Sequence, residues 1–385
     1  MDNKTKIIIF VSVLVVIGLV IAFSFTRSKD NFDTELSIRR FVSMLKPKLL
    51  DNKYALGTVL QQDIPKKLRD AMNRFTVKGV YDPKIKVPDT FDARQKWGDR
   101  ISLPLDQAQC GSCWAFATCG ALQDRLCILL SDREFSSWPM VEYKYSNGNV
   151  KNIKNFLSPY MLDNCQICNY GCDPQSNKNC NTNLLRLVKF VNNNNLCSSV
   201  EDEECAGGFI QSAMIFANQI GLITSKCRQK EFRQTYSCEL HPTLKDSNRG
   251  RQLQDVCRIW KFNKPTSIDT VEHMQQEIFL RGSIVVGFMV YPNFGKFFES
   301  NPKGVYSDLE GLVTPEGGHA VCIVGWGEQD GKKYWLCRNS WGLEFGDNGY
   351  FRILRGENFC TIEQQTFICE PDLNASFAKE FDTPK

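Results

Sequence analysis

The distribution of cysteine constrains this chain more than any other feature. All 17 Cys lie between residues 110 and 369, and the first 109 residues contain none. So many thiols are typical of a protein exported to an oxidising compartment. The three His, at 241, 273 and 319, lack the paired spacing of a zinc site. We therefore expect a Cys-rich body outside the cytosol, preceded by a segment of a different kind.

The overall composition supports a large folded domain. Of the 385 residues, 42% are hydrophobic and 23% are charged, which excludes extended disorder. The 47 basic and 43 acidic residues give a net charge of only +4. Because nucleic-acid binding usually requires a strong basic excess, we expect no nucleic-acid partner.

The N-terminus contains a run that could cross a membrane. Residues 7–25 are 19 residues without a charge, which as a helix would span roughly 28 Å. The run is long for a signal peptide and ends without a small-x-small cleavage site, so we favour an uncleaved signal-anchor, with a cleaved signal peptide as the alternative. Either would place the catalytic part outside the cytosol, as a single-pass membrane protein or as a lysosomal, endosomal or secreted one after processing. The sequon at Asn374 predicts glycosylation there.

One cysteine stands in an unusual context. Apolar residues follow Cys113 at helical spacing, which predicts a helix that Cys113 opens: Phe116, Cys119, Leu122 and Leu126. A thiol at a helix N-terminus lies near the positive end of the helix dipole, which lowers its pKa and favours the nucleophilic thiolate. The alternative is that Cys113 is one more half-cystine.

Two further residues complete the pattern of a thiol nucleophile. His319 opens an alternating apolar run that predicts a strand, and a nucleophilic thiol requires such a base. Asn339 follows 20 residues later in the sequence Asn-Ser-Trp-Gly and could orient the imidazole.

The stretch from Gln107 to Phe116 contains Cys-Gly-Ser-Cys-Trp and, with the His319 and Asn339 motifs, resembles the papain family of cysteine proteases. The resemblance implies a two-lobed α+β fold, in which a helical lobe carries Cys113, a β-barrel-like lobe carries His319 and Asn339, and polypeptide substrates bind between them. It also implies that Gln107 stabilises the oxyanion, that Trp341 shields the His319–Asn339 bond, and that no metal or other cofactor takes part.

Within that family the chain is most similar to cathepsin B, on motifs that begin at Phe91, Asp124 and Gly346. The apolar run gives a signal or anchor segment at 1–26, and the resemblance implies a propeptide at 27–86 and a peptidase domain at 87–370, which leaves a C-terminal tail at 371–385. The resemblance also implies that the propeptide lies along the cleft and inhibits the enzyme until it is cleaved.

The resemblance assigns substrate contacts as well. Gly207 and Gly208 would let the substrate backbone approach closely, and Ala320 would line the S2 pocket. Glu363 would form an acidic floor of that pocket and allow arginine at P2, although it could instead be an ordinary surface residue.

Cathepsin B carries an occluding loop with two histidines, and its nearest match here is Cys238-Glu-Leu-His241. His241 would bind a substrate's C-terminal carboxylate, whereas Leu240 replaces the histidine that would pair with Asp106. We therefore expect a loosely held loop and an enzyme that acts mainly as an endopeptidase.

The remaining 16 Cys are enough for up to eight disulfides. The resemblance implies one of them, Cys110–Cys205. Cys127 lacks its family partner, so it either pairs with an inserted Cys or stays a buried thiol. A further group could be a zinc cluster but is more simply read as disulfides: Cys165, Cys168, Cys172 and Cys180.

Two functions of other classes remain open. The chain could be a catalytically inactive, membrane-anchored binding module, although such homologues usually lose one of the four active-site residues. A purely structural Cys-rich ectodomain would leave the motifs unexplained.

Overall fold

The computed structural model describes residues 48–162, 205–226 and 258–377, apart from 52, 161, 206, 220, 310, 312 and 365. No helix in these ranges is long and apolar enough to cross a membrane. The predicted span at 7–25, His241 and the Cys165–Cys180 group lie outside them.

The described helices are short except for one of 17 residues, and they comprise α2 (Lys66–Asn73), α3 (Ala93–Trp97), α4 (Cys113–Leu129), α5 (Asp132–Ser136), α8 (Ile210–Gln219), α11 (Val271–Arg281), α12 (Phe294–Ser300) and the 3-10 turns η1 (Gln61–Asp63), η2 (Gly98–Arg100) and η3 (Phe359–Thr361). The strands are β1 (Lys48–Leu50), β2 (Tyr54–Leu56), β3 (Val77–Lys78), β4 (Phe91–Asp92), β5 (Met140–Lys144), β6 (Val150–Lys154), β7 (Ile259–Phe262), β8 (Thr266–Ile268), β9 (Ile284–Val290), β10 (Val305–Tyr306), β11 (Gly317–Gln329), β12 (Lys332–Arg338), β13 (Tyr350–Leu354), β14 (Thr366–Ile368) and β15 (Pro371–Phe377).

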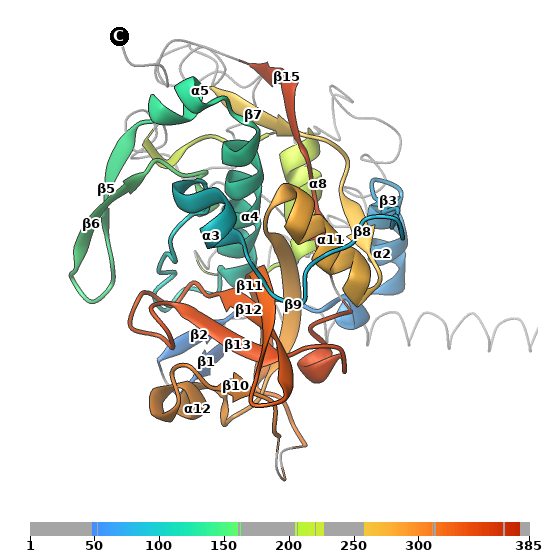
Figure 1. Ribbon diagram of the computed structural model, residues 1–385, viewed down its shortest axis with the longest axis vertical. Coiled ribbons are helices and arrows are strands. Elements are labelled where there is room, and N and C mark those ends of the chain that lie inside the picture. Colours follow the sequence, from blue (N-terminus) through green and yellow to red (C-terminus); the bar gives the residue numbers. More distant parts are fainter. Residues whose placement is uncertain are drawn as a thin grey trace, which may run out of the picture.

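A nine-stranded sheet forms one lobe, and helices dominate the other (Figure 1). The strand order is β10-β13-β12-β11-β9-β14-β8-β3, with β4 paired to β11. The two central strands, β9 and β11, are buried along most of their length, which explains their nearly continuous apolar sequences. The predicted α+β class with two lobes is confirmed.

Helix α4 lies at the centre of the molecule. The sequence predicts burial of one face, but every residue from Cys113 to Cys127 except Gly120 is buried. The helix contacts β9 and β11 in the sheet lobe and α8 in its own, so it has no solvent face to carry polar residues (Figure 1).

The hairpin of β5 and β6 was not predicted from the sequence. Its antiparallel register pairs Lys144 with Val150, so that residues 145–149 form the turn. In Figure 1 it projects down the side of the helical lobe toward the level of β1 and β2.

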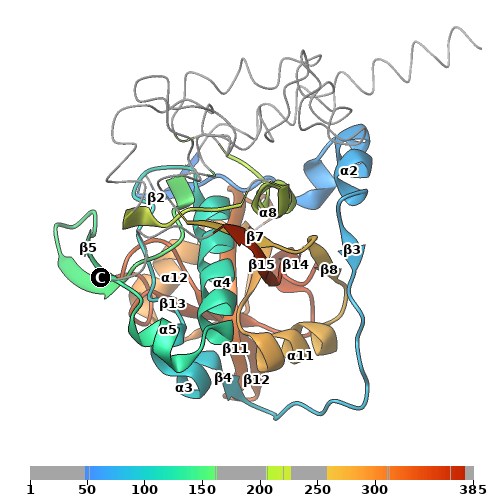
Figure 2. The ribbon, with the colours of Figure 1, turned by 90° about the horizontal axis from the view of Figure 1, so that it is seen from above.

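The segment predicted as the propeptide packs over both lobes. β3 adds to the sheet in parallel with β8, and α2 contacts α8. Figure 2 shows the chain continuing from α2 through β3 down one side of the molecule. The β1–β2 hairpin buries Leu50, Tyr54 and Leu56 against the aromatic core of the sheet lobe. Residues 48–78 are thus an integral layer of the folded chain.

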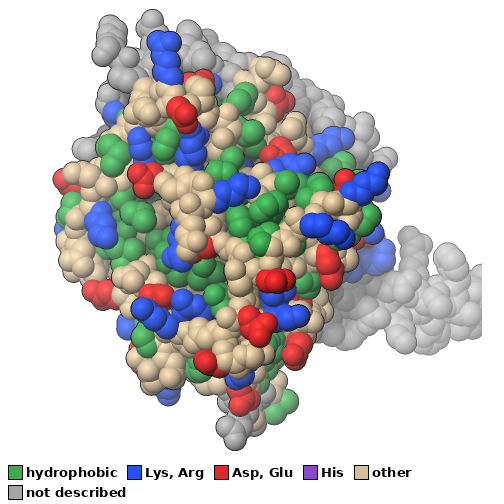
Figure 3. All heavy atoms as spheres, viewed as in Figure 1, with side chains coloured by type: hydrophobic (Ala, Val, Ile, Leu, Met, Phe, Trp, Pro, Cys, Tyr) green, Lys and Arg blue, Asp and Glu red, His purple; other side chains and the backbone are tan. Residues whose placement is uncertain are grey.

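The predicted C-terminal tail begins with a strand instead. β15 pairs with β7, so residues 371–377 belong to the folded body. Asn374 is exposed on this strand, where its side chain can be reached by solvent. On the face shown in Figure 3, basic and acidic side chains are interspersed.

Candidate active site

Cys113 is the first residue of α4, as the sequence predicts, and its side chain is buried. The predicted lowering of its pKa is not found in this covered form: burial raises the pKa of the Cys113 thiol, and hydrogen bonds from Thr58 and from the backbone of Ala320 only partly oppose this. The loss of solvation at the sulfur outweighs the helix dipole, which favours the thiolate. The neutral thiol is therefore the favoured form.

His319 lies on β11, one residue before Ala320, whose backbone bonds the Cys113 thiol. Its Nε2 lies 2.7 Å from Oδ1 of Asn339, while Nδ1 has no hydrogen-bond partner among the described residues. Burial lowers the pKa of His319 to about 4, against the opposing effect of the Asn339 bond. The Trp341 ring stacks on the imidazole with centroids 4.4 Å apart, so Trp341 does cover the His319–Asn339 pair.

Gln107 is held from both sides. Its Nε2 donates to the Cys110 carbonyl at 2.8 Å and to the Ala55 carbonyl at 3.0 Å. Its Oε1 accepts a 2.6 Å bond from the Ser340 hydroxyl, and its backbone N–H donates to the Ser340 carbonyl. Ser340 thereby fixes the orientation of the Gln107 amide group. Because Ser340 directly follows Asn339, these two bonds also connect Gln107 to the segment that contains Asn339.

The segment from Tyr54 to Val59, in the predicted propeptide and called the precursor strand below, runs directly across Cys113. Thr58 Oγ1 lies 3.0 Å from Cys113 Sγ. The backbone on either side is bound to Gly208, which donates to the Gly57 carbonyl and accepts from Val59 N–H, both at 2.8 Å. At Gly57 the fit is so close that a Cβ would lie 1.9 Å from the Gly111 carbonyl oxygen. Thr58 N–H also donates to Gly318, so the segment touches both lobes.

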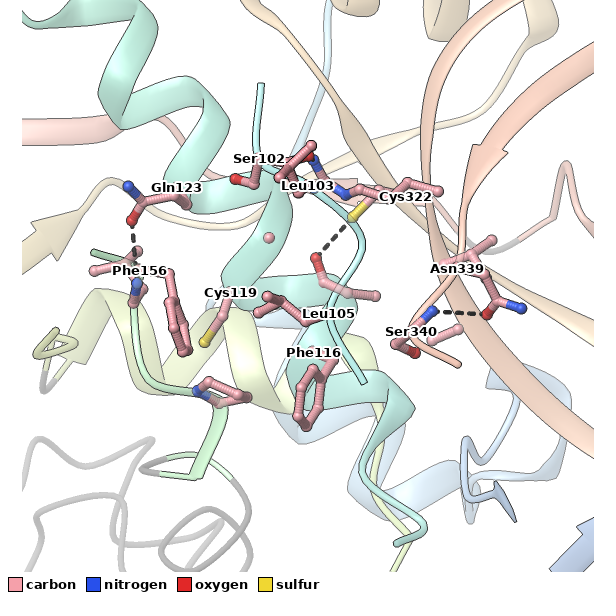
Figure 4. Close-up of a pocket in the computed structure, with 17 residues that line it drawn as sticks. Ser102, Leu103, Leu105, Phe116, Cys119, Gln123, Phe156, Cys322, Asn339 and Ser340 are labelled. Atoms are coloured by element: carbon pink, nitrogen blue, oxygen red, sulfur yellow. Dashed lines mark hydrogen bonds between the residues drawn. The ribbon is translucent and has the colours of Figure 1, made fainter. Parts of the chain in front are cut away.

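A buried ion pair ties the two lobes together behind the site. Arg338, which precedes Asn339, lies 2.9 Å from Asp124 on α4, and Ser102 N–H and Ser283 Oγ also donate to that carboxylate. Figure 4 shows the adjoining cavity, of about 30 Å³, into which Phe116 and Cys119 project from α4 and which Asn339 and Ser340 close.

The predicted backbone-binding residues lie in the cleft. Gly207 and Gly208 are buried, and Gly208 pairs with the precursor strand as described above. Ala320 is fully buried and pairs with Gly287 on β9.

The carboxylate of Glu363, predicted to form the floor of the S2 pocket, accepts three hydrogen bonds. One of its carboxylate oxygens accepts from the Trp335 indole at 2.9 Å and from Gly356 N–H, and the other accepts from Asn358 N–H, both of the latter at 2.7 Å. Both oxygens are therefore engaged in shaping the turn before η3. Glu363 therefore stabilises that turn, and its role at P2 stays a prediction.

Asp106 has a partner that the sequence does not predict. Its carboxylate accepts from Ser146 N–H at 2.9 Å and from the Ser146 hydroxyl, in the turn of the β5–β6 hairpin, and from Ala108 N–H. The other member of the predicted loop site, His241, lies outside the described residues.

The described cysteines form fewer disulfides than the upper limit of eight would allow. Cys110 and Cys205 form the predicted disulfide. Cys127 is a buried thiol that accepts a hydrogen bond from Gln123 Nε2. Five more described cysteines, besides the nucleophile, are also buried and unpaired: Cys119, Cys322, Cys337, Cys360 and Cys369. These six side chains serve as small apolar core residues, so most of the described scaffold is not held by disulfides. No group of three or more His, Cys, Asp or Glu side chains lies together in the described ranges to hold a metal ion.

Several site residues were missed from the sequence. Ser340 lies inside the Asn-Ser-Trp motif and could have been examined there. Ser146 follows two tyrosines and precedes Asn147-Gly148, a strong hairpin signal. Gly57 and Thr58 carry no local signal, because their importance arises only from where the fold places them.

Comparison with known proteins agrees with this geometry. The family model described as "Papain family cysteine protease" matches residues 87–183 and 175–369. A "Cathepsin B-like cysteine proteinase 5" from Caenorhabditis elegans is 32% identical over 74% of this chain and 75% of the relative, and a "Cathepsin B-like CP2" from Giardia intestinalis is 28% identical over 75% and 76%. The solved structure "proCathepsin B S9 from Trypanosoma congolense" covers 82% of this chain and 86% of its own at 21% identity, with a TM-score of 0.53, which supports the shared fold. The chain therefore belongs to the papain family of cysteine proteases.

Proposed function

We propose that the chain is the zymogen of a cathepsin B-like endopeptidase that cleaves peptide bonds through Cys113. The observation that carries this proposal is the contact between Gln107 and the precursor strand. The Gln107 amide donates at 3.0 Å to a peptide carbonyl, that of Ala55, within the same cleft in which Thr58 contacts the Cys113 sulfur. The cleft is thus already shaped to bind an extended backbone with a carbonyl at the oxyanion donor.

The chemistry follows from these positions. The Cys113 thiolate attacks the substrate carbonyl, and the developing oxyanion accepts hydrogen bonds from Gln107 Nε2 and the Cys113 backbone N–H. The His319 imidazolium, held by Asn339, gives its proton to the leaving amine. Water then attacks the thioester, and His319 takes up the proton that water releases, which restores the enzyme.

The precursor strand suppresses this chemistry in two ways. It occupies the place of a substrate, and it keeps water from Cys113 and His319. Burial raises the pKa of the thiol and lowers that of the imidazole, so both effects disfavour the thiolate–imidazolium pair. Cleavage near Val87 and departure of residues 48–78 would expose the site and allow the pair to form.

The finer assignments rest on the sequence. We infer mainly endopeptidase activity, because Leu240 replaces the histidine that would hold an occluding loop. The proposed anchor at 7–25 would attach the zymogen to a membrane, with the catalytic domain outside the cytosol, and cleavage near Val87 would release the domain. Asn374, exposed on β15, is the proposed glycosylation site.

The test is hydrolysis of a peptidyl coumarin amide by protein cleaved near Val87. We expect activity in the wild-type protein and none in Cys113→Ala. Cys119→Ala, in the same helix, is the matched control and should retain activity, because its sulfur only fills the core. Activity of the Cys113 variant equal to wild type would refute the proposal, and an inactive wild-type protein would favour the binding-module alternative.

A further inference from the structure

A pocket of about 330 Å³ lies beside the active site, on the side away from Gly208. The order of contacts along the precursor strand places it: Thr58 lies at Gly208, Ala55 at Gln107, and Tyr54 at Trp341. The family resemblance places the S2 pocket, and with it the acyl half of the substrate, at Ala320. The strand around Thr58 binds Gly208 and Gly318 at that end, so the Trp341 side receives the residues after the scissile bond. The pocket volume is at the small end of the range for ligand sites, enough for about one or two residues.

The β5–β6 hairpin builds the outer wall of this pocket. Ser146 bonds to Asp106 beside Gln107, and Asn147 Nδ2 donates at 2.7 Å to Glu344 in the loop after Trp341. The hairpin base is fixed to the same segment, because the Tyr145 hydroxyl donates to the Pro104 carbonyl at 3.0 Å. The turn therefore contacts loops on both sides of the pocket and holds two carboxylates at its rim.

The precursor shows what the pocket accepts. The Tyr54 ring stacks on Trp341, with centroids 4.5 Å apart and planes 15° apart, and meets Phe345 edge-on at 5.4 Å. Lys53 also lines the pocket. Among the described residues that line it, Lys53 is the only cation, and it leaves with the propeptide. Without Lys53, the described residues that line the pocket include the acidic Asp106 and Glu344 but no Lys or Arg.

We propose that this hairpin-walled pocket is a leaving-group subsite that takes an aromatic side chain and rejects a free C-terminal carboxylate. The aromatic selectivity comes from Trp341 and Phe345, and the rejection comes from repulsion by the rim carboxylates of Asp106 and Glu344. The inference rests on the proposed peptidase function and adds a reason for cleavage within chains rather than near their C-termini.

The experiment compares internally quenched peptides that end two residues after the scissile bond, either as the amide or as the free acid. We expect wild-type enzyme to cleave the amide about 10-fold faster, since one charge near a protein surface at this range changes rates by roughly this factor. Glu344→Gln should reduce the ratio to about 3, and Glu344→Lys should bring it to one or below. Phe in place of Ala at the first or second of these two positions should raise cleavage about fivefold.

Two controls separate the possible failures. Glu357→Gln removes an exposed carboxylate outside the pocket and should leave the amide-to-acid ratio unchanged. A peptidyl methyl ester has only a methoxy group after the scissile bond and leaves the pocket empty, so all variants should hydrolyse it alike. The inference alone would be overturned if wild-type enzyme hydrolyses that compound normally but cleaves the peptide acid as fast as the peptide amide, or faster. No hydrolysis of it by wild type would overturn the proposed function and this inference together.

Discussion

Gly57 is the position at which a single methyl group tests the inhibitory role of the propeptide. A Cβ there would lie 1.9 Å from the Gly111 carbonyl oxygen and 2.5 Å from its carbon, so Gly57→Ala must lift the strand out of the cleft. The lift breaks the two bonds to Gly208 and weakens the bonds of Thr58 to Gly318 and Cys113. At about 0.5–1.5 kcal/mol per bond, the strand loses about 2–4 kcal/mol. That corresponds to a roughly 30- to 700-fold larger fraction of molecules with an open site.

The assay is the initial rate at which iodoacetamide alkylates Cys113 in uncleaved chains, which mass spectrometry distinguishes from processed ones. We expect Gly57→Ala to be alkylated at least 30-fold faster than wild type. Val80→Ala, at an exposed position of the same segment, is the control and should match wild type. Equal rates in wild type and Gly57→Ala would show that the strand does not guard the thiol.

Two further predictions concern residues that support the site. Ser340→Ala removes the 2.6 Å bond that orients Gln107 and should lower kcat/KM for a peptidyl amide by about 5- to 30-fold, less than loss of the oxyanion donor itself; an unchanged kcat/KM would contradict this positioning role. Asp124→Asn leaves Arg338 buried without its counter-charge and should reduce the free energy of unfolding by about 3 kcal/mol or more in urea titrations; a change below about 0.5 kcal/mol, the scale of surface substitutions, would show that the pair contributes little.

The proposed catalytic residues could be identified in the sequence because each lies within a short local motif. Cys113 opens a helix that the apolar spacing indicates, and His319 begins a strand that the alternation indicates. The Cys110–Cys205 disulfide followed from the same resemblance. The disulfide joins residues 95 positions apart, so only the family resemblance, and no local pattern, could predict it.

The sequence does not predict features that depend on contacts between residues far apart in the chain. The hydrogen bond from the Trp335 indole to Glu363 joins residues 28 positions apart and has no local signal in the sequence. The sequence set an upper limit of eight disulfides and left the state of Cys127 open, but it did not indicate that Cys322 and Cys337 are buried free thiols. The contact of Thr58 with Cys113 joins residues 55 positions apart in the chain, and no local pattern reports such a contact.

The central claim is that departure of the propeptide converts Cys113 from a protected thiol into a reactive thiolate paired with His319. The most direct measurement is the pH dependence of Cys113 alkylation in the intact and in the cleaved chain. Because burial raises the pKa of Cys113 and lowers that of His319 to about 4, the intact chain should carry little thiolate at pH 6 and react appreciably only above the ordinary thiol pKa of about 8.5. The cleaved chain should already react fast at pH 6, with the label on Cys113. A cleaved chain that titrates like an ordinary thiol, or that is labelled on another cysteine, would contradict the account.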